Sequence, residues 1–398
     1  MHAKQFRPVL QTAVITLAVV VMIVFPQEVV TAAREGFALW AHYVLPALLP
    51  FFIFAELLMG TGFVHLLGVL LEPVMRPVFR LPGSAAFVVV MGYTSGPPIG
   101  AVLTAKLYRE NLLTPVEAER LLTFTTNTSP GFMLGAVAAG MFGNPGLGLL
   151  LAAVNYSANL LLGIGMRFYG RGEPESAAPK ASGQRLLRTA FRAMLRAQQQ
   201  DNRPFGQLMG DAVRNSISTI LHVGGFIVLF AVLIRVGMVL GFVQLLTLGL
   251  GSILHLLRID PALFPGLVDG LFEVTLGAKA ITQTTAPVYQ QILLVSALMA
   301  WGGVSVHAQV ASFISGTPIR LFPFVLGRFV HALLAVGIMT LITASHLPTA
   351  FTPVSQPLWQ TQALALLLAT ISTGLVLMTL QLIYKVITNV LQRCLSPR

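Results

Sequence analysis

The chain is poor in charge and nearly free of cysteine. Only 10% of its 398 residues are charged, and 14 residues are acidic, whereas a soluble domain carries about 25% charged residues. The single cysteine, Cys394, can form neither an intrachain disulfide nor a thiolate metal cluster. Since 55% of the residues are hydrophobic, the composition excludes a soluble globular enzyme and a disordered chain.

Long uncharged apolar runs are what the chain has in abundance. About 20 apolar residues cross one hydrocarbon core, so this length has room for about ten such segments. Outer-membrane barrels show alternating segments of about ten residues instead, so we predict an all-α polytopic membrane protein. The first run, residues 9–25, is compatible with a signal peptide, but it lacks a small-residue cleavage site and favours an uncleaved membrane helix.

Two apolar runs are interrupted by residues that cannot continue a helix. Residues 92–100 read GYTSGPPIG, with two prolines and three glycines. In hydrocarbon, broken backbone is tolerated only where it is buried in protein or lines a cavity. We therefore expect residues 83–108 to form a re-entrant hairpin of two half-helices. Residues 125–131, TTNTSPG, interrupt the next run and predict an unwound transmembrane helix.

The second half of the chain repeats the first. Residues 62–67, GFVHLL, match residues 241–246, GFVQLL, and the break at 125–131 corresponds to WGGVSVH at 301–307. Each copy contains a helix, an interfacial helix, a broken hairpin, an unwound helix and a further helix. Interrupted segments at matching positions of two halves point to a transporter site. The expected divisions are a membrane helix (1–36), two repeats (37–169 and 207–345), a basic cytoplasmic linker (170–206), and a C-terminal membrane helix with a basic tail (346–398).

The distribution of basic residues indicates the topology. If the N-terminus is cytoplasmic and each hairpin re-enters on its own side, the repeats are inverted and both termini are cytoplasmic. Only four of the 25 basic residues then lie outside, namely Arg34, Arg235, Arg258 and Lys279. This agrees with the positive-inside rule, so the net charge of +11 requires no nucleic acid partner. The basic segment 185–196 is compatible with a solvated face that fixes topology or with binding to anionic membrane lipid.

Short polar side chains gather at the four broken segments. Half-helix N-termini offer free N–H groups and partial positive charge, which favours an anion. We predict a substrate site there, with no catalytic residue, no cofactor and no metal, because no two histidines have metal-ligand spacing. The candidate residues are Ser95, Gly96, Thr126, Asn127, Thr128, Ser129, Glu273, Thr275, Ser305, His307 and Gln309.

Two of these candidates are ionisable. A carboxyl group inside the bilayer is expensive and is a functional hypothesis by default, so Glu273 is our candidate for coupling transport to protons or to a cation. The alternative is that Glu273 caps a half-helix or pairs with Lys279. His307 is equally compatible with a titrating ligand and with a buried histidine bonded to a backbone carbonyl.

Several motifs resemble one known family. LPALLPFF (45–52), LEPVMRP (71–77), MGYTSG (91–96), FGNP (142–145) and WGGVSVHAQV (301–310) resemble the YlbJ-type sporulation integral membrane proteins across about residues 25–345. The resemblance implies that both repeats are nucleoside-recognition Gate domains, similar to concentrative nucleoside transporters and to the Gate regions of FeoB. It also implies a multi-pass protein of the outer forespore membrane in a spore-forming bacterium, and passage of dipicolinic acid into the forespore.

These observations lead to one main hypothesis and two alternatives. The main hypothesis is a permease for a small polar or anionic solute, with dipicolinic acid as the solute that the resemblance implies. The alternatives are a nucleoside-type permease and a non-transporting membrane scaffold of sporulation. We expect no enzyme, because the apolar segments hold no paired catalytic side chains and the chain has no nucleotide-binding loop. Besides the solute and membrane lipid, the sequence is compatible with assembly as a homo-oligomer.

Overall fold

The computed structural model describes residues 2–173, 175–176 and 186–346. Within these ranges the chain is almost wholly helical and contains no strand, which confirms the all-α class. The expected C-terminal membrane helix and the tail at 346–398 lie, apart from residue 346, outside the described residues.

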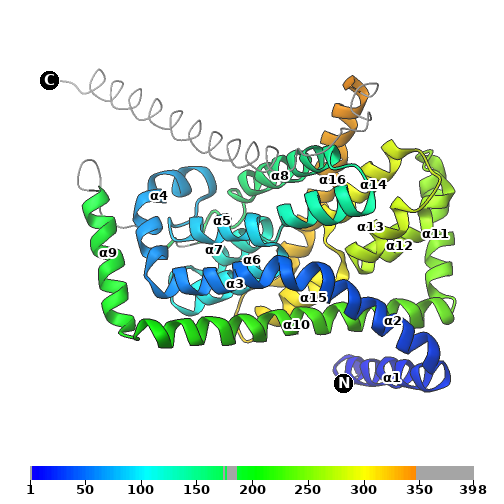
Figure 1. Ribbon diagram of the computed structural model, residues 1–398, viewed down its shortest axis with the longest axis horizontal. Coiled ribbons are helices and arrows are strands. Elements are labelled where there is room, and N and C mark those ends of the chain that lie inside the picture. Colours follow the sequence, from blue (N-terminus) through cyan, green and yellow to red (C-terminus); the bar gives the residue numbers. More distant parts are fainter. Residues whose placement is uncertain (1, 174, 177–185, 347–398) are drawn as a thin grey trace.

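Two long helical stretches run side by side along one face of the protein (Figure 1). One is α10 (Phe205–Val239). The other is formed by α2 (Pro26–Leu39), a π-helical turn and α3 (Leu45–Gly60). The indole of Trp40 joins them by donating a hydrogen bond to the Ile220 carbonyl oxygen at 3.1 Å. The domain boundary expected at residue 36 therefore falls inside α2, after α1 (His2–Val24) bends away from it by 102°.

The two halves present their elements in the same order. The first half continues through α4 (Phe63–Phe79), α5 (Ala85–Ser95), α6 (Pro97–Arg109), α7 (Pro115–Thr125), η2 (Gly131–Met141) and α8 (Gly146–Met166). After α9 (Leu186–Asp201) and α10, the second half continues through α11 (Phe242–Leu256), η4 (Pro261–Leu263), α12 (Phe264–Phe272), α13 (Val274–Thr282), α14 (Val288–Trp301), α15 (Gly303–Phe313) and α16 (Leu321–His346).

Matching junctions use the same backbone conformation. Left-handed glycines precede α4 and α11, with φ of 74° at Gly62 and 75° at Gly241. Left-handed arginines follow them, with φ of 55° at Arg80 and 57° at Arg258. Helices α4 and α11 lie at opposite ends of α10, roughly across its axis (Figure 1).

The first hairpin depends on glycine at its turn and on its inner face. Gly96 has a φ of 102° between α5 and α6. Pro97 begins α6, at a position where a backbone N–H would have no acceptor within the helix, so proline is tolerated there. A Cβ added at Gly100 would lie 2.4 Å from the Thr125 carbonyl oxygen. This close approach places the hairpin against the C-terminal end of α7.

Both helices that were expected to unwind are broken. Helix α7 starts with a capping box between Thr114 and Glu117 and ends at Thr125, and five residues separate it from η2. Helices α14 and α15 meet at two left-handed glycines, Gly302 and Gly303, with φ of 85° and 78°. Broken backbone therefore occurs at matching positions of the two halves.

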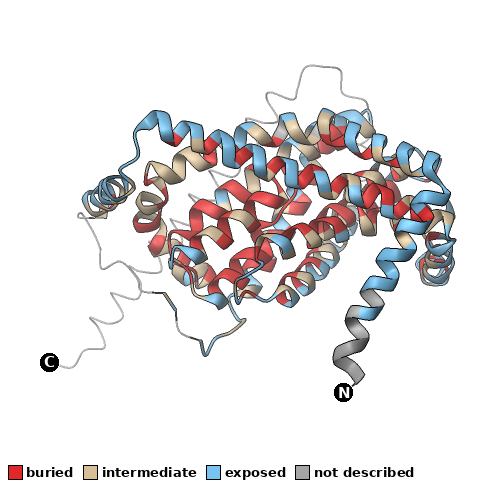
Figure 2. Ribbon diagram, turned by 90° about the horizontal axis from the view of Figure 1, so that it is seen from below, coloured by how far each residue is buried: buried red, intermediate tan, exposed pale blue. Residues whose placement is uncertain are grey.

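Length and composition identify the helices able to cross a membrane. In the described part of the chain four stretches qualify, or up to six if each sharply bent pair counts as one span. The four are α8, α10, α14 with α15, and most of α16. Figure 2 shows buried residues gathered in the interior helices, while outer helices carry exposed residues on one side. Exposed apolar side chains such as Phe322 and Phe329 fit helices that face lipid.

Candidate functional site

A central cavity of about 450 Å³ lies between the two halves of the protein. Both hairpins and both broken helices contribute to its wall, together with the turn before α3 and the middle of α10. The polar residues that line it are His42, Thr128, Ser129, Glu273, Thr275 and Gln309. Five of these six are among the residues predicted from the sequence, and they come from three different broken segments.

Two hydroxyl groups of the first broken helix are tied to backbone. The Thr128 hydroxyl donates to the Met299 carbonyl oxygen at 3.1 Å, which joins the first broken helix to the second. The Ser129 hydroxyl accepts a hydrogen bond from the Phe132 N–H at 3.2 Å. Both side chains remain on the cavity wall. Because the Ser129 hydroxyl accepts in its bond to Phe132, it keeps its O–H as a donor, whereas the Thr128 hydroxyl has used its donor on Met299.

The first hairpin offers the cavity fewer N–H donors than we expected. Pro97 and Pro98 occupy the first two positions of α6 and line the cavity. Proline has no backbone N–H, so this half-helix terminus presents apolar rings where another residue would present donors. The expected attraction of an anion by a hairpin N-terminus is therefore weaker here.

Glu273 forms the turn of the second hairpin and is 3% exposed. One carboxylate oxygen accepts from the Leu276 N–H at 2.8 Å, and the other accepts from the Thr275 hydroxyl at 3.2 Å. Glu273 thus caps α13, which is one of the two alternatives, and it forms no ion pair with Lys279 in the described structure. Its position on the cavity wall is what a coupling role requires.

The second broken helix divides its polar residues between two environments. Gln309 lines the cavity, and its amide nitrogen donates to the Ser305 hydroxyl at 3.4 Å. His307 does not line the cavity. Its Nδ1 lies 2.7 Å from the Gly303 carbonyl oxygen, its ring packs against Trp301, and its buried Nε2 has no hydrogen-bond partner among the described residues. This is the backbone-bonded alternative for His307.

The other predicted residues are buried next to the cavity without lining it. The Thr126 hydroxyl donates to the Leu122 carbonyl oxygen at 3.1 Å inside its own helix. Ser95 and Gly96 lie at the end of the first hairpin, where a Cβ at Gly96 would lie 3.4 Å from Ser129. Asn127 is fully buried and neither of its amide atoms has a hydrogen-bond partner in the described structure. An unpaired buried amide costs about 1–3 kcal/mol, so Asn127 stays a candidate for a hydrogen bond to the solute.

Arg328 is a central residue, and the prediction that it lies on the cytoplasmic side is wrong. Counted as cytoplasmic on charge grounds, it is only 1% exposed and lies in the core. Its Nε donates to the Ala300 carbonyl oxygen at 2.8 Å and its Nη1 to the Thr126 carbonyl oxygen at 2.6 Å. These carbonyls lie where α14 and α7 end, and the last carbonyls of a helix have no intrahelical donor. An arginine inside the apolar run 321–341 was the signal that could have found it.

The asparagines of α8 join helices together. The Asn155 amide donates to the Ser296 hydroxyl at 3.1 Å, and the Asn159 amide donates to the Tyr93 hydroxyl at 2.9 Å. Neither asparagine lines the central cavity. They provide hydrogen bonds between helices, as polar residues commonly do inside membranes.

A polar cluster lies at the start of α7, outside the candidate spans. Glu119 accepts hydrogen bonds from the Arg320 Nε at 2.8 Å and from the Tyr169 hydroxyl at 2.6 Å. Burial alone would raise the pKa of the Glu119 carboxyl, but these donors outweigh burial and hold its pKa below the usual value.

Comparison with known proteins agrees with the sequence motifs. A family model described as nucleoside recognition, the Gate domain, matches residues 41–145. The sporulation integral membrane protein YlbJ of Bacillus subtilis is 42% identical over 329 residues, which cover 81% of this chain and 81% of the relative. The chain belongs to this family. It is therefore an integral membrane protein with several membrane-spanning helices.

The remaining matches are weaker. An uncharacterised protein of Alkalihalophilus pseudofirmus is 31% identical over 142 residues, which cover 34% of this chain and 30% of the relative. No solved structure matches the chain significantly.

Proposed function

We propose that the protein is a membrane permease in which a small polar or anionic solute passes through the central cavity. The observation that carries this proposal is a single cavity of about 450 Å³ whose wall combines polar residues from both halves of the chain. That volume lies within the range of about 300–1,000 Å³ of small-molecule sites. In transporters built from repeats, the substrate site lies at the junction of the repeats and is formed by broken helices.

Two inverted repeats supply the moving parts in this proposal. The shared element order, the matching left-handed junctions at Gly62 and Gly241, and the placement of α4 and α11 at opposite ends of α10 support it. In such proteins one repeat rocks against the other and exposes a fixed site to each side in turn. The basic helix α9 then lies in the cytoplasm together with both termini.

Dipicolinic acid is the solute we propose, carried into the forespore across its outer membrane. The support is the sporulation role named for the relative YlbJ and a wall that offers a hydroxyl donor at Ser129 and an amide donor at Gln309. A planar dicarboxylate of one ring fits the cavity volume. Because Glu273 lines the same wall, an anion can bind there when this carboxyl is protonated or paired with a cation. Movement of the solute is then coupled to movement of the proton or cation. The Gate description favours a nucleoside as the competing solute.

Uptake by proteoliposomes tests the proposal. We expect the reconstituted protein to accumulate labelled dipicolinate in preference to nucleosides, and Thr275→Ala and Gln309→Ala to reduce uptake at least several-fold. Thr94→Ala is the matched control, because its hydroxyl also lies near a hairpin turn but donates to the Val90 carbonyl oxygen of its own helix, and Thr94 does not line the central cavity. Uptake that is absent, or that survives both cavity substitutions unchanged, contradicts the proposal.

A non-transporting scaffold is the second candidate, and one feature favours it. Helix α9 exposes an apolar stripe that includes Leu187 and Phe191, which are 65% and 55% exposed. A stripe of this kind fits a protein or lipid partner. This alternative predicts that sporulation tolerates Gln309→Ala but is impaired by Leu187→Ser combined with Phe191→Ser.

A further inference from the structure

Helix α9 exposes a row of large apolar side chains. Its other side packs on α4, where Ala190 is buried and a Cβ added at Gly62 would lie 3.2 Å from the Ala197 Cβ. The exposed apolar side chains follow one another at four-residue spacing and form the apolar row, namely Leu187, Phe191 and Leu195. A helix that only covered α4 would carry polar residues on its outer side. The apolar row therefore requires a partner outside the described structure.

A row of arginines lies beside the apolar row. Each of its members comes one residue after a member of the apolar row and is exposed: Arg188, Arg192 and Arg196. With about 3.6 residues per helical turn, the two rows run side by side along α9. None of the three arginines forms an ion pair within the described residues. The single acidic residue of α9, Asp201, is paired with Arg203, so unpaired positive charge borders the apolar row.

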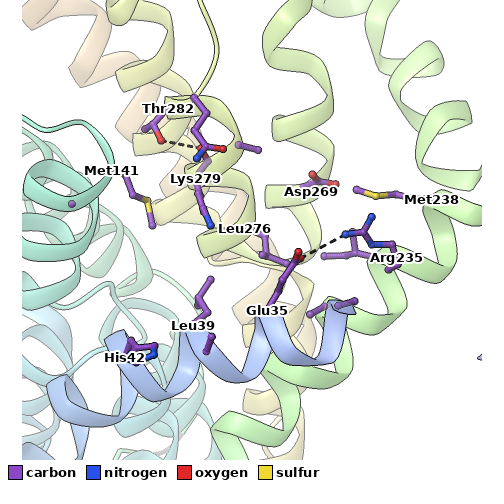
Figure 3. Close-up of a pocket in the computed structure, with 17 residues that line it drawn as sticks. Glu35, Leu39, His42, Met141, Arg235, Met238, Asp269, Leu276, Lys279 and Thr282 are labelled. Atoms are coloured by element: carbon purple, nitrogen blue, oxygen red, sulfur yellow. Dashed lines mark hydrogen bonds and ion pairs between the residues drawn. The ribbon is translucent and has the colours of Figure 1, made fainter. Parts of the chain in front are cut away.

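Basic charge is compensated at the opposite end of α10. Arg235 lies 3.5 Å from a Glu28 carboxylate oxygen and 3.6 Å from a Glu35 carboxylate oxygen. Figure 3 shows Arg235 and Glu35 directed toward each other in the pocket between α2 and α10. The arginines of α9 have no such acidic neighbours in the described structure, so the end of the protein that carries α9 is the one that attracts an anionic surface.

The orientation of α9 is that of a helix lying in the membrane plane. Helix α10 is a candidate membrane span, and Figure 1 shows α9 running crosswise to it at its end. Three residues join the two helices, and the first of them, Asn202, has a left-handed φ of 50°. Exposed apolar side chains continue at Phe205 and Met209 in the first turns of α10. Helix α9 thus lies next to a surface that faces lipid.

We propose that α9 is an interfacial helix that binds the anionic surface of the protein's own membrane. The apolar row enters the boundary between headgroups and acyl chains, and the three arginines bind the phosphate groups of anionic phospholipids. Helices that lie in this boundary combine arginines on one side with leucine and phenylalanine on the other. A guanidinium donates two parallel hydrogen bonds to a phosphate, and its long stem lets it reach a headgroup from the apolar boundary.

The membrane is favoured over a protein as the partner of the apolar row. The crosswise orientation and the lipid-facing start of α10 place the row beside the bilayer, and the arginine row complements a negatively charged headgroup layer. For the basic segment 185–196, the proposal selects lipid binding over a solvated face. It concerns a surface outside the central cavity and holds for any solute.

Spin labels on the full-length protein test the position of the apolar row. Replacement of Cys394, the chain's single cysteine, by serine gives a thiol-free background for Phe191→Cys. Gln200→Cys is the matched control, because Gln200 is exposed on the same helix and continues the arginine row at the next four-residue step. Collisions of each nitroxide with oxygen, which concentrates in lipid, are compared with collisions with a nickel complex that stays in water.

The expected result is a large difference between the two positions. In proteoliposomes of equal parts phosphatidylcholine and phosphatidylglycerol, the ratio of oxygen to nickel collisions should be several-fold higher at position 191 than at position 200. An equal ratio would mean that the apolar row faces water, and exclusion of both reagents from position 191 would mean that a second copy of the chain covers it. Either result overturns the proposal.

Neutralising the arginines tests the anionic headgroups. Each basic residue beside an anionic surface favours the bound state about fivefold, so glutamine at positions 188, 192 and 196 should strongly lower the collision ratio at position 191. The same variant should change little in vesicles of phosphatidylcholine alone, and lysine at the three positions should keep most of the ratio. No fall in the anionic vesicles, or an equal fall in both lipids, overturns the role of the arginines. None of these measurements depends on solute uptake, so their outcome is separate from that of the proposed function.

Discussion

Replacing Arg328 by methionine tests the contact on which the two broken helices converge. The guanidinium donates to the Ala300 and Thr126 carbonyl oxygens at 2.8 Å and 2.6 Å, and no acidic side chain among the described residues forms an ion pair with it. Its charge is instead stabilised by the negative ends of α7 and α14. Methionine keeps much of the volume and removes every donor.

Two opposing terms set the size of the effect. A buried carbonyl left without a donor costs about 1–3 kcal/mol, so the two carbonyls together cost up to about 6 kcal/mol, less whatever the His331 Nδ1 at 3.2 Å from the Ala300 oxygen retains. Replacing buried ion pairs by hydrophobic residues of similar volume stabilises other proteins by about 1–4 kcal/mol, and we take that range as an upper limit for removing the Arg328 charge. The first term is larger, so we expect Arg328→Met to destabilise the protein by about 1–3 kcal/mol. Arg328→Gln keeps an amide donor for one carbonyl and should lose less.

Thermal unfolding in detergent, followed by tryptophan fluorescence, measures this difference. Arg34→Met is the control, because Arg34 is an exposed arginine on α2. Transport by the same variants separates stability from geometry. If Arg328 positions the broken helices, Arg328→Gln should lower kcat for uptake at a temperature where the variant remains folded. Refutation would be an Arg328→Met protein that melts at the parent temperature and transports at the parent rate.

Two further predictions concern packing and pH. Gly100→Ala places a Cβ 2.4 Å from the Thr125 carbonyl oxygen and should destabilise by about 1–3 kcal/mol, whereas Gly165→Ala, with nothing within 4 Å, should be neutral or slightly stabilising in the same melting assay. Glu119 has a lowered pKa because hydrogen bonds such as those from Arg320 outweigh burial, so its contribution to stability is present above the unfolded pKa of about 4.3 and is lost as pH falls through the lower folded pKa. The melting temperature of the parent should therefore fall more steeply below about pH 4 than that of Glu119→Gln, and parallel curves would contradict this assignment.

The breaks in the helices were predictable, because their causes are local. Gly96 and Pro97 in the first hairpin, and Gly302 and Gly303 in the second broken helix, act through their own backbone angles. The apolar runs between them set helix positions to within a few residues. The start of α2 at Pro26 was the main difference, since the polar residues between 26 and 36 hid a helix that packs along α10.

The site was predictable only as a neighbourhood. In the sequence, Gln309 and His307 lie two residues apart on one broken helix. Side chains at that spacing point to different sides of a helix. Which side faces the cavity depends on how α15 packs against its neighbours, and the structure gives that position to Gln309. The proline rings at the first hairpin were visible in the sequence, but their place on the cavity wall was not.

The sequence by itself therefore determined that this is an all-helical membrane protein with two similar halves and four broken segments, because length, hydropathy and backbone propensity act over a few neighbouring residues. Only the tertiary structure decided which polar groups meet. The carbonyls bound by Arg328 come from residues 28 and 202 positions away in the chain, and no local pattern encodes such a contact. The same holds for the central cavity, whose wall combines side chains from both halves.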